Sequence, residues 1–130
     1  MTRLQDWEVR LAEAVEAAKG VPFAWGQHDC ATWAFDVRAA LTGTPRPAWS
    51  YTTEAGGRRW MKRQGWAGFT EAATAILGEP VAPLMAQRGD IVLLIEPEAF
   101  GVCLGAQVAA VGPVGLTMVP LRSCRLAWRV

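Results

Sequence analysis

Residues 22–36, PFAWGQHDCATWAFD, decide how this chain is interpreted, because a loop passes here into an apolar helical pattern. Gly26 can adopt backbone conformations that other residues resist, and Asp29 stands where a helix N-cap belongs. Cys30 would then be the first residue of the helix, and His28, the one histidine of the chain, precedes it by two positions. The stretch therefore poses the question of whether Cys30 is a catalytic nucleophile.

A cysteine at the first turn of a helix has a sound geometry for nucleophilic chemistry. The unpaired N–H groups and the dipole of the helix favour the thiolate, which is the reactive form. The same N–H groups could hold the oxyanion of an acyl-transfer intermediate. The alternative is that Cys30 is a small buried apolar residue, as most free cysteines are, and that Asp29 only caps and supports the helix.

Length and composition predict one folded domain over residues 1–130, since the chain is too short for two sizeable cores. Apolar residues make up 52% and charged residues 19%, which argues against disorder. The net charge is +1, so no nucleic-acid footprint is expected. The one basic cluster fits the solvent-exposed face of a short helix. It consists of Arg58, Arg59, Lys62 and Arg63.

The three cysteines predict neither a disulfide framework nor a zinc site. Cys30, Cys103 and Cys124 are odd in number and have no CxxC spacing, so we expect no metal or other cofactor. Cys103 and Cys124 lie in apolar segments and are expected in the core. The N-terminal residues mix charged and apolar side chains, unlike a secretory signal. No apolar run approaches the roughly 20 residues of a membrane span.

The order of the predicted elements indicates an α+β fold, with N-terminal helices packed on a C-terminal antiparallel β-sheet. Apolar residues at helical spacing predict helices over residues 4–18, 30–41, 53–64 and 69–77. After Pro83 the pattern changes to short apolar segments separated by Gly, Pro or Ser. These predicted strands are residues 90–95, 100–105, 107–112, 115–121 and 124–130.

Three segments resemble the NlpC-type branch of papain-like cysteine peptidases. They are WGQHDCATWAFDVRAALTG (25–43), QRGDIVLLI (87–95) and FGVCLG (100–105). Members of that branch cleave amide bonds in bacterial cell-wall peptides. The resemblance implies a papain-like fold, Cys30 at the nucleophile position, and Asp90 capping or orienting the first strand of the sheet.

Nearly the whole chain resembles a small family encoded in the tail modules of phages, prophages and gene transfer agents. The shared segments include FAWGQHDC (23–30), YTTEAGGRRWMKRQGW (51–66), RGDIVL (88–93), GVCLG (101–105) and AWRV (127–130). This resemblance implies a protein made in the bacterial cytoplasm and assembled into a particle tail. Its implied partners are other tail or hub proteins.

The chain departs from the peptidase pattern at the residues that handle protons. In the hydrolytic relatives a base histidine opens the strand that matches FGVCLG, where this chain has Ala99 or Phe100. A third, polar position on the following strand falls at Ala109 or Ala110. Losing a general acid–base typically costs about 10²–10⁴ in rate. The catalytic set implied by the resemblance is therefore incomplete.

His28 is the only imidazole that could replace the missing base. In the papain arrangement the base approaches from the sheet, whereas a residue two positions before a helix points away from that face. We therefore expect a loop residue whose ring bonds to the backbone and packs on Trp25.

Two functions remain open at this stage. The first is a structural tail or hub-associated component with a degenerate peptidase fold. The second is an active peptidoglycan amidase or endopeptidase, with cell-wall peptides as substrate, Cys30 as nucleophile and His28 or a partner's residue as base. Some of the chain's tryptophans are candidate interface anchors under the first function. These candidates are Trp25, Trp49, Trp60, Trp66 and Trp128.

Overall fold

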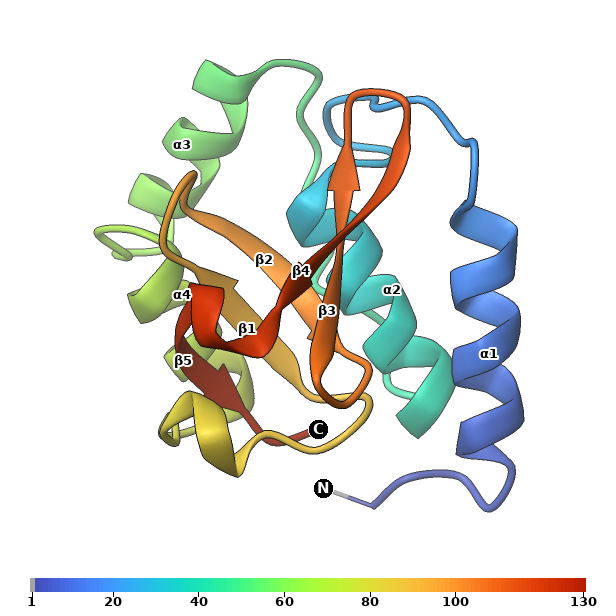
Figure 1. Cartoon of the computed structure of the whole chain (residues 1–130). Coiled ribbons are helices and arrows are strands. Elements are labelled where there is room, and N and C mark those ends of the chain that lie inside the picture. Colours follow the sequence, from blue (N-terminus) through green and yellow to red (C-terminus); the bar gives the residue numbers. More distant parts are fainter. Residues whose placement is uncertain (1) are drawn as a thin grey trace.

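The computed structural model describes residues 2–130 as four helices followed by a five-stranded sheet (Figure 1). The helices are α1 (Trp7–Ala18), α2 (Cys30–Thr42), α3 (Glu54–Arg63) and α4 (Phe69–Leu77). The strands are β1 (Ile91–Leu94), β2 (Ala99–Cys103), β3 (Gln107–Gly112), β4 (Gly115–Pro120) and β5 (Cys124–Trp128). Two 3₁₀ turns, η1 (Pro83–Met85) and η2 (Leu121–Ser123), complete the described elements. The predicted α+β class is confirmed.

All neighbouring strands are antiparallel, and their order across the sheet is β4-β3-β2-β1-β5. Strand β1 pairs with β2 on one side and with β5 on the other, so that Ile91 lies opposite both Val102 and Trp128. All four residues of β1 are buried, as expected for a strand covered on both faces. The last strand of the chain thus completes the sheet beside the first.

The two faces of the sheet are covered differently. The larger core lies between the sheet and the helices, and includes Phe35 and Leu41 from α2 with Phe100 and Trp128 from the strands. On the opposite face, a smaller core is closed by residues from the segments around η1 and η2. Within residues 2–130, none of the helices combines the length and apolarity needed to cross a bilayer.

Two local expectations, those for Leu4 and Trp128, are corrected by this packing. Leu4 precedes α1, and its backbone N–H donates to the carbonyl of Leu41 at 2.7 Å. Trp33 and Phe35 of α2 are both buried, because α2 is enclosed by both α1 and the sheet. Trp128 is fully buried in the sheet core, so it cannot anchor a partner at the surface.

Candidate functional site

The start of α2 is held by the carboxylate of Asp29, which is fully buried. Its Oδ1 accepts the N–H of Thr32 at 2.8 Å, while the Thr32 hydroxyl accepts the N–H of Asp29 at 2.8 Å, which forms a capping box. Its Oδ2 accepts the N–H of Gly26 at 2.8 Å and the hydroxyl of Tyr51 at 2.6 Å. Both carboxylate oxygens are therefore engaged in holding the loop, the helix and Tyr51 together.

Tyr51 closes this loop from the other side. Gly26 has φ +79°, and a Cβ built on it would lie 1.8 Å from the Tyr51 carbonyl oxygen, so only glycine fits there. Burial and the hydrogen bond to Asp29 raise the pKa of the Tyr51 phenol above its ordinary value. Sequence reasoning did not single out Tyr51, although it is the only tyrosine of the chain. Its being the single tyrosine is the one feature of the sequence that could have drawn attention to it.

Cys30 is the first residue of α2 and is partly buried. Burial raises the pKa of its thiol to about 11, the backbone N–H of Phe100 opposes this rise, and the negative charge of Asp29 adds to it. The N–H groups at the helix start, those of Ala31 and Cys30, act in the same direction as that of Phe100 but do not compensate for burial. At neutral pH the sulfur is therefore a protonated thiol.

Hydrocarbon side chains occupy the sheet opposite Cys30. Phe100 is 2% exposed and belongs to the helix-facing core that Cys30 contacts, with its ring 5.8 Å from that of Phe35. Side chains alternate along a strand, so the neighbouring Ala99 faces the other side of the sheet. On β3, Ala109 belongs to the helix-facing core and Ala110 to the smaller one. Of the two candidate pairs, Phe100 and Ala109 are thus the members on the helix-facing side of the sheet.

His28 does not form a pair with Cys30. Its backbone pairs with Ala24, and its Nε2 is buried without a hydrogen-bond partner in the part of the chain that the structure describes. The expectation that the ring bonds to the backbone is therefore wrong for this nitrogen. Burial raises the pKa of Asp36, and the charges of Arg46 and His28 oppose that rise.

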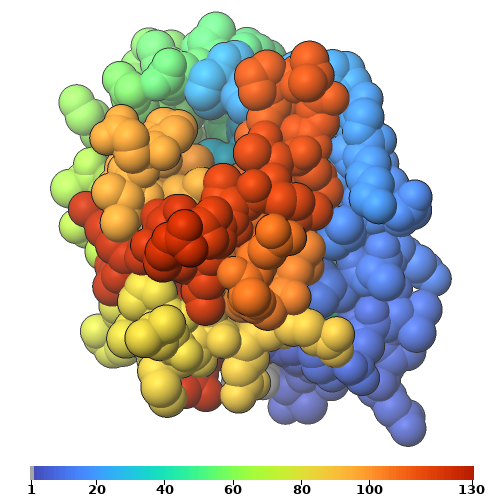
Figure 2. Space-filling view, viewed as in Figure 1, coloured from blue at the N-terminus to red at the C-terminus, as the bar shows by residue number. Residues whose placement is uncertain are grey.

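Figure 2 shows a shallow hollow between the β1–β2 loop and β4, with the colour of α2 visible at its base. Trp25, 40% exposed, lies in the loop before α2 with its ring 4.7 Å from Phe23.

The chain matches the family described as Domain of unknown function (DUF6950) over residues 2–130. It belongs to the DUF6950 family. No curated protein matches it.

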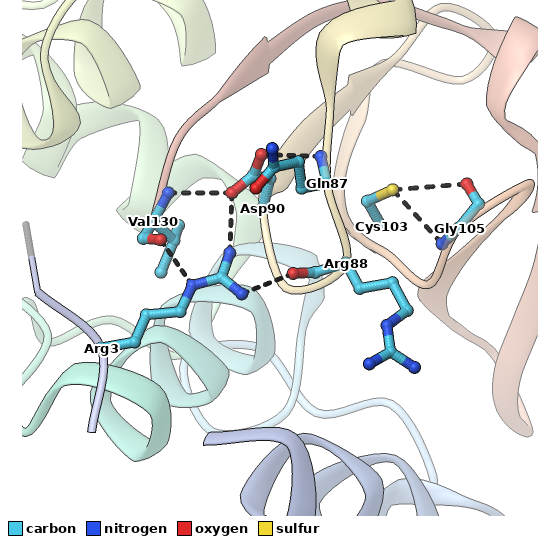
Figure 3. Close-up of polar contacts among 7 residues, drawn as sticks. All are labelled: Arg3, Gln87, Arg88, Asp90, Cys103, Gly105 and Val130. Carbon is cyan, nitrogen blue, oxygen red and sulfur yellow. Dashed lines mark hydrogen bonds and ion pairs between the residues drawn. The ribbon is translucent and has the colours of Figure 1, made fainter. Parts of the chain in front are cut away.

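In this DUF6950 domain a second buried carboxylate, Asp90, connects the two ends of the described chain (Figure 3). Its Oδ1 accepts Arg3 Nη2 and the N–H of Val130, each at 3.0 Å, and its Oδ2 accepts the N–H of Gln87 at 2.9 Å. Arg3 Nε also donates to the Val130 carbonyl at 2.7 Å. Asp90 therefore fixes the entry into β1, as the sequence indicated, and its bonds are structural. Sequence reasoning missed Arg3.

The remaining candidate groups of this DUF6950 domain also have structural positions. Cys103 and Cys124 are buried in the smaller core, as predicted, and burial raises the pKa of both thiols. Across residues 2–130, no cluster of three or more His, Cys, Asp or Glu residues could hold a metal ion. The groups gathered around the start of α2 are therefore the Cys30 thiol, the Asp29 carboxylate and the Tyr51 phenol, with His28 in the preceding loop.

Proposed function

We propose that this chain is a structural component of the tail of a phage or gene transfer agent, with a papain-like, NlpC-type fold that has lost its peptidase chemistry. One observation carries the proposal. The residue of β2 whose backbone N–H acts on the Cys30 thiol is Phe100, so this position holds a buried phenylalanine instead of a histidine. A phenyl ring can neither accept the thiol proton nor return it to a leaving group.

The arrangement of the elements supports the peptidase ancestry. Cys30 begins a helix that packs against an antiparallel sheet, and β2, the strand matched to the base-bearing strand of the peptidases, passes beside it. The thiol also lies near the N–H groups that begin α2. A thiol at a helix start beside a sheet is the arrangement that a cysteine nucleophile needs, and it supports the proposed papain-like ancestry.

The protonation of the site supports the loss of activity. An active cysteine peptidase lowers the pKa of its thiol through a neighbouring cation, whereas burial raises the pKa of Cys30 to about 11. Among the residues that the structure describes, the charge that acts on this thiol is that of Asp29, and it opposes ionisation. Both oxygens of Asp29 already accept hydrogen bonds from Gly26, Thr32 and Tyr51, so this carboxylate has a structural role beside the thiol.

The alternative, an active peptidoglycan amidase or endopeptidase, is tested by digestion. The purified chain and its Cys30→Ala variant are incubated with muropeptides, and released peptides are quantified by mass spectrometry beside an active amidase as positive control. We expect no release above buffer from either protein. Release by the native chain that disappears in Cys30→Ala would overturn the proposal.

The tail assignment is tested separately by binding. The chain is co-expressed with each tail and hub protein encoded in the same gene module, and complexes are isolated by size-exclusion chromatography. We expect a stable complex with at least one of these proteins. Failure to bind any of them would refute the structural role, whatever the digestion shows.

A further inference from the structure

Helix α3 carries its cations on a face that makes no contribution to the core. None of its residues is buried, and its two largest apolar residues, Trp60 and Met61, are only partly covered. The Trp60 ring lies 5.5 Å from both Trp49 and Trp66, which attaches one side of the helix to the protein. The opposite side is exposed and presents Arg58, Arg59, Lys62 and Arg63.

The charge of α3 is segregated from that of the rest of the chain. Its ten residues hold four cations and one carboxylate, a net charge of +3, whereas the whole chain has +1, so the remaining residues sum to −2. Arg58 is paired with Glu54 on the same helix. The other three cations have no ion-pair partner within residues 2–130. Elsewhere Arg10 and Arg125 are paired, whereas Arg122 and Arg129 are exposed and unpaired but are not gathered with other cations on one helix face. The outer face of α3 is thus an uncompensated cationic surface.

The sequence of α3 is not one that favours a helix by itself. Two glycines in its first turns, Gly56 and Gly57, each cost about 1 kcal/mol relative to alanine. The helix is held by the Thr53 cap, whose hydroxyl accepts the N–H of Gly56 at 3.0 Å, and by the Tyr51 ring, which packs against Gly57. A Cβ on Gly57 would lie 3.3 Å from that ring. The cap and the Tyr51 ring therefore hold in place a helix that contributes no buried residue to the core and that carries the four cations.

We propose that the outer face of α3 docks against an acidic surface of a neighbouring tail or hub protein. This inference rests on the proposed function and names the chemistry of the partner. Opposite charges guide such association and fix its register. A protein surface fits better than nucleic acid, because the whole chain carries a net charge of only +1 and its cationic face is confined to one helix.

Lysine-specific cross-linking provides a direct test, because the chain contains only two lysines, Lys19 and Lys62. Each complex with a co-expressed tail or hub protein is treated with a carbodiimide, which joins an amine to a carboxylate without a spacer. We expect Lys62 to be joined to an Asp or Glu of the partner. Lys19, which is paired with Glu16 at 2.9 Å on α1, serves as the internal control for reagent access.

Matched charge reversals measure the contribution of the face to binding. Arg59→Glu with Arg63→Glu changes the net charge by the same amount as Arg122→Glu with Arg129→Glu, and all four arginines are exposed. We expect the first pair to weaken the complex about tenfold or more and the second pair to change it less than about threefold. Circular dichroism verifies that both variants remain folded.

The outcomes separate this inference from the proposed function. A complex in which Lys62 is not joined to the partner and both variants bind equally overturns the docking face but leaves the tail role intact. Absence of any complex overturns both. Binding of a 20-base-pair duplex with a comparable dissociation constant, or cross-links from Lys62 only to other copies of this chain, also overturns the inference.

Discussion

The ionisation of the Cys30 thiol is the property that most directly distinguishes an inactive peptidase site from an active one. Its pKa of about 11 compares with 9.0 for an ordinary thiol. At pH 7 roughly one Cys30 side chain in 10⁴ is then ionised, about a hundredfold fewer than for the unperturbed group. Since alkylation requires the thiolate, the rate at Cys30 should be depressed by a similar factor.

Peptide-resolved alkylation measures this pKa without altering the protein. The chain is pulsed with iodoacetamide between pH 7 and 11.5, quenched and digested with trypsin. The peptide covering residues 20–38 reports Cys30 alone. We expect a rate midpoint near pH 11 for the folded chain and near 9 for the same peptide in denaturant. A folded-state midpoint below that of the denatured chain would refute the reasoning, because it requires an activating cation that overcomes burial.

The same shift predicts a loss of stability at high pH. Because folding raises the pKa of Cys30, the protonated thiol contributes to the free energy of unfolding. This contribution is fully present below about pH 9 and is lost as the pH rises through 11. The loss amounts to at most about 2.7 kcal/mol in the free energy of unfolding. Urea titrations of the native chain and of Cys30→Ala should diverge across this interval. Parallel pH profiles would contradict the assignment to Cys30.

Three further substitutions test the contacts around the site and the sheet. Tyr51→Phe removes a donor from a buried carboxylate and should lower the free energy of unfolding by about 1.5–3 kcal/mol in urea; no change would mean that the hydrogen bond is not needed. Arg3→Met leaves the Asp90 carboxylate buried without its cation and should cost about 3–5 kcal/mol in guanidinium, so a cost under about 1 would exclude the clamp. Gly26→Ala should abolish folding, judged by soluble yield and thermal melting. Gly65→Ala is its control, since that glycine has φ +87° but no atom within 4 Å of its Cβ, and it should cost only about 1–2 kcal/mol; similar losses in the two variants would exclude the steric argument.

Much of the backbone could be predicted from local patterns. The helix start at Cys30 follows from Asp29 and the periodicity behind it, and its end follows from Gly43, which has φ +79°. The predicted strand 90–95 appears as β1, shortened by a residue or so at each end. Such features depend on a few neighbouring residues, so the order of residues is sufficient to predict them.

The contacts of the candidate site could be predicted only in part. The resemblance to the peptidases left Ala99 and Phe100 as alternatives for the base position, and the fold puts Phe100 on the helix-facing side of the sheet. The bond between Tyr51 and Asp29 joins residues 22 positions apart. The salt bridge between Arg3 and Asp90 joins residues 87 positions apart. No local pattern encodes such pairings.

The sequence by itself determined the α+β class, the helix cap beside Cys30 and the shortage of proton-handling residues. These depend on residue type and spacing, which are already present in the linear chain. Only the tertiary structure decided that burial raises the pKa of Asp36 while the charge of His28 opposes that rise, and that the Tyr51 hydroxyl donates to Oδ2 of Asp29. It also decided that burial raises the pKa of the Cys30 thiol. The physical reason is that a pKa and a hydrogen bond depend on which groups surround an atom in space, and those groups come from segments that only folding brings together.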